Sequence, residues 1–239
     1  MRTGEATTPA GMRLYAIGDI HGCADKLALL HERIAADLAA RPTPDHRIIH
    51  IGDYGDRGAD TAGVVARLAG MTDDARIVFL RGNHDQKWLD FLADGDLNGA
   101  AFLSFGGKAT ARSYGVGNRT RNYADLSAAL AAAMPPEHRA FLDTTRTSVR
   151  FGDYFFTHAG VRPGVPLDAQ TDEDLMWIRE EFLLDTRDFG VVVVHGHTVT
   201  PSMTPEIHAN RIAIDTGAVF GGPLTCVVLE GTGVRFIAA

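Results

Sequence analysis

Five apolar runs in this sequence are each followed by glycine together with aspartate, asparagine or histidine. Their β-branched and aromatic residues predict strands that are buried on both faces, as in parallel sheets. The runs cover residues 14–17, 48–51, 77–80, 154–156 and 191–194. Open α/β folds bind ligands at the carboxyl edge of such a sheet, which is where these polar residues would meet. One such ending alone would be an ordinary turn, whereas five of them predict a site.

The second of these endings carries the densest group of charges. Residues 47–51 run into Gly52, and Asp53, Asp56 and Arg57 follow directly. We expect Asp53 at the edge of the sheet, with Asp56 and Arg57 in the loop just beyond it. Two acids and a permanent cation this close together are unsuited to a core and typical of a functional site.

Strand and helix patterns alternate in the first half of the chain, and strands dominate the second half. We expect helices at residues 25–40, 61–71, 85–93, 123–134 and 172–184, a hairpin at 148–157, and strands at 211–215, 224–229 and 234–237. This order predicts an α/β fold in which two mixed sheets pack as a sandwich flanked by helices. Residues 94–122 are glycine-rich without a clear period, so they could be a cap over the site or a structural filler.

The composition and the first eleven residues limit the class of protein to which the chain can belong. Residues 1–11 are polar without a period, so we expect a disordered lead-in before a single domain at residues 12–239. A net charge of −7 argues against nucleic acid or an anionic membrane as a partner. Two cysteines, Cys23 and Cys226, with no signal peptide and no membrane-spanning run, predict a cytoplasmic protein. The sequence does not indicate an oligomeric state.

Aspartate, histidine and asparagine beside glycine suit divalent metals of intermediate hardness, such as Mn²⁺, Fe²⁺ or Zn²⁺. No cysteine belongs to the set, which argues against a structural zinc site. Two ions about 3.5–4 Å apart need a bridging carboxylate, and Asp53 is the natural candidate. Asp19 and His21 are two residues apart and can point the same way from an extended segment.

The successive motifs resemble the phosphoprotein-phosphatase (PPP) branch of the calcineurin-like metallophosphoesterases, including its bacterial and phage members. The matching stretches, in the order of the family, are Gly18-Asp19-Ile20-His21-Gly22, Gly52-Asp53-Tyr54-Gly55-Asp56-Arg57-Gly58, Arg81-Gly82-Asn83-His84, His158-Ala159-Gly160, Gly196-His197-Thr198 and residues 214–222. Gly55 and Asp85 depart from residues common in relatives, but neither removes a predicted ligand. The resemblance implies the family's fold and a site with two divalent metal ions, foremost Mn²⁺.

The resemblance also implies a role for each matching residue. Asp19 and His21 would hold one metal ion and Asn83, His158 and His197 the other, with Asp53 shared by both. Arg57 and Arg179 would bind the phosphate together with Asn83, although Arg179 lies in a weaker match. His84, oriented by Asp56, would protonate the leaving group while a hydroxide bridging the two metals attacks phosphorus in line, without a covalent phosphoenzyme. The alternative for the six predicted ligands is ordinary turn chemistry at strand ends.

Three functions are consistent with these residues. The resemblance favours a protein serine/threonine phosphatase acting on a phosphorylated protein or a small phosphoester. The first alternative is symmetrical hydrolysis of diadenosine tetraphosphate to two ADP molecules, since that branch shares the motifs. A more remote alternative is a non-catalytic binder of phosphopeptides or nucleotides, which would be expected to have lost ligands; none is missing here.

Overall fold

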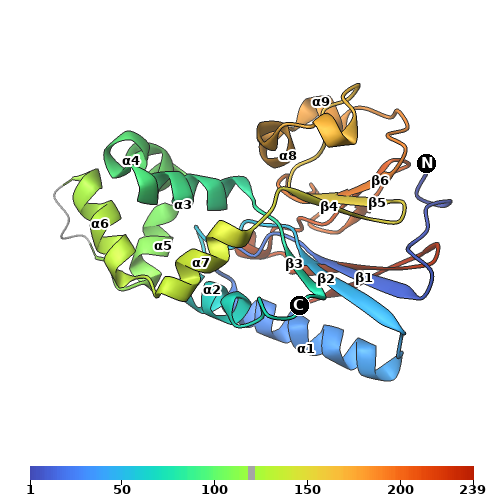
Figure 1. Cartoon of the computed structure of the whole chain (residues 1–239), viewed down its shortest axis with the longest axis horizontal. Coiled ribbons are helices and arrows are strands. Elements are labelled where there is room, and N and C mark those ends of the chain that lie inside the picture. The colour runs from blue at the N-terminus through green and yellow to red at the C-terminus, as the bar shows by residue number, and fades with distance from the viewer. Residues whose placement is uncertain (118–121) are drawn as a thin grey trace.

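The computed structural model, which describes residues 1–117 and 122–239, is built on two five-stranded mixed sheets packed face to face (Figure 1). The first sheet has the order β10-β9-β1-β2-β3, in which β1, β2 and β3 are parallel. Its strands are β1 Met12–Ile17, β2 Asp45–His50, β3 Ile77–Phe79, β9 Thr225–Glu230 and β10 Gly233–Ala238. The α/β sandwich predicted from the sequence is therefore confirmed.

The second sheet has the order β4-β5-β6-β8-β7. Its strands are β4 Ser148–Phe151, β5 Tyr154–Thr157, β6 Val192–His195, β7 Glu206–Ile207 and β8 Arg211–Ala213. β4 and β5 form the predicted hairpin, while β5, β6 and β8 run parallel. Both sheets thus contain neighbouring parallel strands whose carboxyl ends can carry a site.

The side chains of β1 show how the core divides between the two faces of a sheet. Leu14 and Ala16 point into the layer between the sheets, where they meet residues such as Phe156 and Val194. Tyr15 and Ile17 point to the other face, where helices cover the sheet. Successive side chains of a strand alternate between faces. A strand buried on both faces therefore needs an unbroken apolar run, as this sequence has.

Helices cover the outer faces of both sheets. Seven of them follow the first sheet's strands: α1 Ala24–Ala40, α2 Thr61–Ala69, α3 Asn83–Ala93, α4 Gly95–Ser104, α5 Gly107–Ser113, α6 Tyr123–Ala133 and α7 Pro136–Thr144. The short α8 Asp172–Trp177 and α9 Glu180–Leu183 lie over the second sheet, where Leu175 and Phe182 pack against Phe155 and Val193. In Figure 1, α3 to α6 form a helical lobe beside the sandwich.

The glycine-rich region 94–122, which the sequence left open as a cap over the site or a structural filler, contains α4 and α5 and contributes to the lobe. Residues 118–121 lie outside the described part of the chain. Asp94 begins α4 by accepting a hydrogen bond from Leu97 N at 3.0 Å. Any side chain at Gly99 would overlap Tyr123 at the start of α6. The glycines here permit close helix packing, which a sequence pattern cannot distinguish from a loop.

Residues 1–11 lie against the sandwich, in contrast to the disordered lead-in that we expected. Ala6 is fully buried in the layer between the sheets. Thr3 N donates to Ala209 O at 2.9 Å, and Thr8 N donates to Gly231 O at 3.1 Å. These backbone bonds and one small apolar side chain hold a segment whose polar composition gave no sign of order.

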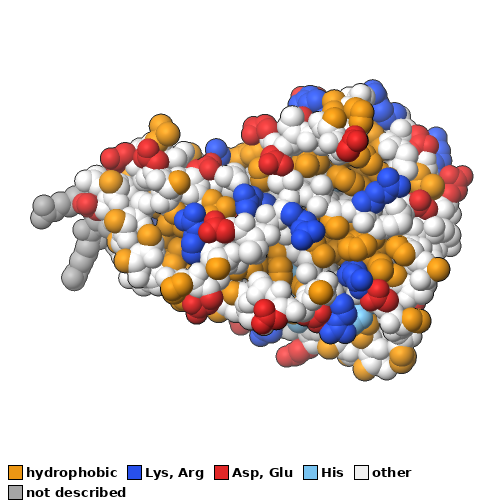
Figure 2. Space-filling model, viewed as in Figure 1, with side chains coloured by type: hydrophobic (Ala, Val, Ile, Leu, Met, Phe, Trp, Pro, Cys, Tyr) orange, Lys and Arg blue, Asp and Glu red, His pale blue; other side chains and the backbone are white. Residues whose placement is uncertain are grey.

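The surface is of mixed charge on the face shown in Figure 2, where acidic and basic side chains are interspersed among apolar ones. The net charge of −7 is therefore not gathered on this face in one acidic field. Among the described residues, every helix is too short or too polar to span a lipid bilayer.

Candidate active site

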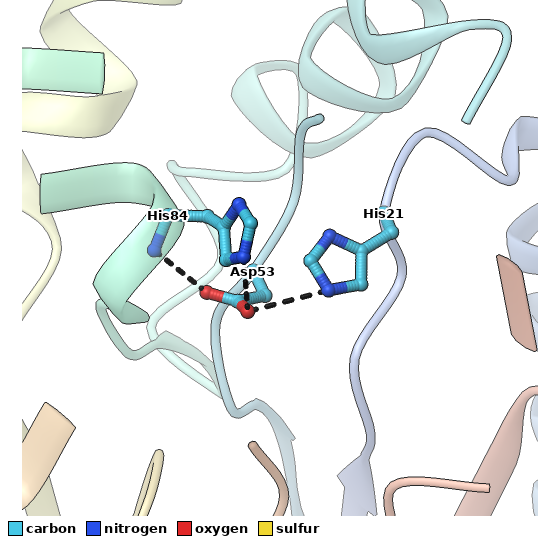
Figure 3. Close-up of side chains that lie close together, drawn as sticks. All are labelled: His21, Asp53 and His84. Carbon is cyan, nitrogen blue, oxygen red and sulfur yellow. Dashed lines mark hydrogen bonds and ion pairs between the residues drawn. The ribbon is translucent and has the colours of Figure 1, made fainter. Parts of the chain in front are cut away.

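The polar residues predicted from the strand ends come together at the edge where the two sheets meet. β1 leads into Asp19 and His21, β2 into Asp53, and β3 into the first turn of α3, which holds Asn83 and His84. β5 and β6 of the second sheet deliver His158 and His197. All seven side chains are buried. Figure 3 shows three of them, His21, Asp53 and His84, converging from three separate segments.

Asp53 is the centre of this cluster. Its Oδ2 lies 3.3 Å from His21 Nε2 and 3.9 Å from His84 Nε2 (Figure 3). Its Oδ1 lies 3.4 Å from His158 Nε2. Two sets of potential metal ligands share it, with ligand atoms within 4.8 Å of one another. One set is His21, Asp53 and His84, and the other is Asp19, Asp53 and His158. Asp53 is the residue common to both sets.

The other predicted ligands, Asn83 and His197, complete the group. Asn83 Oδ1 lies 2.9 Å from both His158 Nε2 and His197 Nδ1. The backbone N–H of His197 donates to Asp19 Oδ2 at 3.2 Å. The structure thus brings all six predicted ligands together. In the two sets of potential ligands, Asp19 lies with His158 and His21 lies with His84. The predicted assignment instead places Asp19 and His21 on the same ion.

The donor set fits divalent cations. His158 Nδ1 donates to Ile51 O at 3.0 Å, so the Nε2 lone pair of this neutral ring faces two oxygens, Asp53 Oδ1 at 3.4 Å and Asn83 Oδ1 at 2.9 Å. His21 Nδ1 likewise donates to Gly55 O at 2.8 Å. His197 Nε2 is buried without a hydrogen-bond partner among the described residues. Carboxylate oxygens and imidazole lone pairs that face one another repel unless a cation lies between them.

Burial shifts the pKa of each of these groups in the direction that favours its neutral form. Burial, with the nearby Asp215 and Asp53 carboxylates, raises the pKa of Asp19 well above its usual value. The pKa of Asp53 is raised in the same way, by burial and then by Asp85. Burial also lowers the pKa of His158 well below its usual value. A bound divalent cation would offset the cost of charging the carboxylates and would suit the neutral imidazoles.

The backbone at the site is held in uncommon conformations. His21, Asp53, Asp56, Arg57 and His197 all have positive φ angles, between 43° and 68°. Such angles cost non-glycine residues about 1–3 kcal/mol each and persist only where the surroundings impose them. Asp85 imposes part of this geometry, since its carboxylate accepts hydrogen bonds from the N–H groups of Gly82, Asp53 and Tyr54. The sequence analysis assigned no role to Asp85, whose carboxylate accepts from backbone N–H groups among the described residues.

Two of the predicted glycines let backbone approach the carboxylates directly. A Cβ at Gly82 would overlap Asp53 Oδ1, and a Cβ at Gly196 would overlap Asp19 Oδ1. Neither position can therefore carry a side chain while the carboxylates stay in place.

His84 and Asp56 form a hydrogen-bonded pair, with Nδ1 and Oδ2 2.8 Å apart. Burial raises the pKa of Asp56 to about 7 and lowers the pKa of His84 to about 3. Both shifts disfavour the charged forms of the two groups. His84 Nε2 faces the Asp53 carboxylate, so the pair lies beside the candidate metal centre.

The two predicted phosphate-binding arginines lie at different depths. Arg57 donates to His21 Nε2 at 2.6 Å and to His84 Nε2 at 2.7 Å. Arg179 is exposed, and its Nη1 donates to Thr198 Oγ1 at 3.1 Å, next to His197. The predicted helix at 172–184 is broken between α8 and α9, and Arg179 lies at this break. The break places its guanidinium at the rim of the site.

Three aromatic residues at the site were given no role by the sequence analysis, although Phe220 lies in the matching stretch 214–222. The rings of Phe105 and His84 lie 5.1 Å apart, and Trp177 lies 5.5 Å from Phe105 and 6.2 Å from His197. Phe220 lies beneath the guanidinium of Arg57, at 5.6 Å. Isolated aromatic residues are ordinary core material, so only the tertiary structure reveals that Phe105 and Trp177 lie beside histidines of the site and Phe220 beside Arg57.

Comparison with known proteins identifies the class to which this fold and site belong. The family model for calcineurin-like phosphoesterases matches residues 12–238, and the chain belongs to this family. It is therefore a metal-dependent hydrolase of phosphoesters.

Among particular relatives, the chain is 25% identical over 238 residues to the bis(5'-nucleosyl)-tetraphosphatase PrpE [asymmetrical] of Oceanobacillus iheyensis, covering 90% of this chain and 87% of the relative. It is 30% identical over 223 residues to serine/threonine-protein phosphatase 1 of Salmonella typhimurium, covering 91% and 92%. The crystal structure of a candidate diadenosine tetraphosphatase shares the fold with a TM-score of 0.67 and 21% identity, over 98% of both chains.

Proposed function

We propose that the chain is a PPP-type phosphatase that removes phosphate from phosphoserine and phosphothreonine in proteins. The observation that carries this proposal is the Asp56–His84 pair beside Asp53. A serine or threonine alkoxide is a strongly basic leaving group and needs a proton as the P–O bond breaks. A phosphate chain is a weakly basic leaving group and needs none. The relative from Salmonella typhimurium, named as a serine/threonine-protein phosphatase, supports the proposal.

The six converging ligands support a centre of two divalent ions, with Mn²⁺ first and Fe²⁺ or Zn²⁺ as alternatives. Asp19 and His21 would hold one ion and Asn83, His158 and His197 the other, with Asp53 shared. Ions bound there would supply Lewis-acid chemistry and lower the pKa of bound water. The protein's own groups do the rest: Arg57 and Arg179 hold phosphate oxygens, and Asp56 orients His84 to give its proton to the leaving oxygen.

The test is hydrolysis of a phosphoserine or phosphothreonine peptide in the presence of Mn²⁺. We predict turnover by the wild-type chain and a loss of at least about 100-fold in Asp53→Asn, because the shared carboxylate charge is removed. Asp73→Asn is the control, since Asp73 is exposed on the surface. Failure of the wild type to act on the peptides, or undiminished turnover by Asp53→Asn, would contradict the proposal.

Dinucleoside tetraphosphate hydrolysis is the second candidate, and Phe220 favours it. The ring of Phe220 is 56% exposed and lies beside Arg57, so a nucleobase could stack on it while Arg57 holds a phosphate. Six relatives named as asymmetrical tetraphosphatases match over most of the chain, whereas a relative named as symmetrical matches over 31% of it. Chromatography of the products distinguishes two ADP molecules from unequal products.

We also propose a cytoplasmic location. Cys23 and Cys226 are both free thiols. Unpaired cysteines are compatible with a reducing compartment.

A further inference from the structure

A buried side chain of helix α5 contacts the loop that carries Asp56, the hydrogen-bond partner of the proposed proton donor His84. Thr110 is fully buried, and its Oγ1 donates to Asp56 Oδ1 at 2.6 Å. The same oxygen accepts a hydrogen bond from the backbone N–H of Asp56 at 2.9 Å. It also lies 3.3 Å from Thr61 Oγ1 at the start of α2. One hydroxyl therefore holds both the backbone and the carboxylate of Asp56.

The loop that Thr110 holds is strained and tightly enclosed. Asp56 and Arg57 have consecutive positive φ angles of 68° and 65°. The backbone N–H of Arg57 donates to Gly106 O at 3.3 Å, immediately before α5 begins. A Cβ at Gly55 would lie 3.2 Å from Thr110 Oγ1 and closer still to Thr61. The start of α5 thus imposes the conformation of two neighbouring site residues.

The two oxygens of Asp56 are divided between two partners. Oδ1 accepts from Thr110, while Oδ2 lies 2.8 Å from His84 Nδ1. Fixing Oδ1 fixes the rotation of the carboxylate, and this in turn fixes the ring of His84 with Nε2 toward the metal-ligand cluster. We propose that Thr110 is a positioning residue for proton transfer to the leaving group. The inference depends on the proposed role of His84 in the phosphatase function.

Leaving-group dependence separates this role from a merely structural one. Phosphoserine needs a proton on its leaving oxygen, whereas 2,4-dinitrophenyl phosphate has a leaving group that departs without one. Loss of positioning should therefore slow only the first substrate. Loss of packing, of metal binding or of phosphate binding should slow both.

The experiment compares kcat for a phosphoserine peptide and for 2,4-dinitrophenyl phosphate in Thr110→Val, Thr110→Ser and the wild type, with Mn²⁺ bound. Thr110→Val keeps the shape and removes the hydroxyl, and Thr110→Ser keeps the hydroxyl. We expect Thr110→Val to lose about 10- to 100-fold on the peptide, part of the usual contribution of general acid catalysis, and less than about 2-fold on the aryl phosphate. Thr110→Ser should resemble the wild type on both substrates.

Equal losses on the two substrates, or no loss on the peptide, would overturn the inference. If Thr110→Val does not fold, Thr110→Ala, which adds no bulk, gives the same ratio under the same criteria. His84→Gln separates the two proposals. If His84→Gln does not lose activity selectively on the phosphoserine peptide, the proposed proton transfer by His84 is wrong. If His84→Gln shows this selective loss and the Thr110 variants do not, only the positioning role of Thr110 is wrong.

Discussion

At the scale of single residues, charge pairing away from the active site accounts for part of the stability. Asp37 on α1 is 7% exposed, and its carboxylate contacts Arg41, Arg235 and the hydroxyl of Tyr15. Burial alone would raise its pKa, but the hydrogen bonds from Arg235, Tyr15 and Arg41 outweigh burial and lower it to about 2. The buried negative charge of Asp37 is thus paired with two arginines and one hydroxyl.

The lowered pKa of Asp37 predicts a specific acid sensitivity. Its folded pKa lies below the ordinary value, so its contribution to the free energy of unfolding is complete above about pH 4 and is lost as the pH falls toward 2. We expect this contribution to be about 1–2 kcal/mol and to be absent in Asp37→Asn. Urea unfolding between pH 2 and pH 7 measures it, with Asp73→Asn as the control. Equal losses of stability on acidification in Asp37→Asn and the wild type would contradict this explanation.

At the scale of elements, the helical lobe depends on close contacts that glycine permits. Gly99 in α4 faces Tyr123 at the start of α6, and Gly95 in the same helix faces Ser127. The stacked rings of Phe91 and Phe102, with centroids 4.3 Å apart, join α3 to α4. The lobe carries α5, and α5 holds the loop of Asp56, so the packing of these helices bears on the site.

Gly99→Ala tests the packing of the lobe. Alanine favours a helix over glycine by about 1 kcal/mol, but here its methyl group would overlap Tyr123. Overpacking costs about 1–3 kcal/mol, so after the gain in helix propensity we expect a net loss of up to about 2 kcal/mol in the free energy of unfolding, measured by urea denaturation. Gly70→Ala, where the nearest atoms would lie 3.6 Å away, should be neutral or stabilising. If Gly99→Ala is as stable as Gly70→Ala, the close contact is unimportant.

At the scale of the whole molecule, the sequence predicted the sandwich and the meeting of the six ligands because both follow from local patterns. An apolar run that ends in glycine and aspartate, as at Asp53, identifies a strand and its polar end together. The contacts that Thr110, Trp177 and Phe220 make at the site could not be predicted, because they depend on how distant helices and loops pack. The helices at 95–113 were missed for a related reason: their glycines serve helix contacts, and glycine in a sequence signals a turn.

The central claim is that residues from both sheets bind two cations that share Asp53. The most direct test is the metal content of the chain, measured by elemental analysis after incubation with Mn²⁺ and removal of free ions. We predict about two ions per chain in the wild type and in Asp73→Asn, and fewer than about one in Asp53→Asn. A wild-type chain that retains no metal, or an Asp53→Asn chain that still retains two ions, would contradict the account.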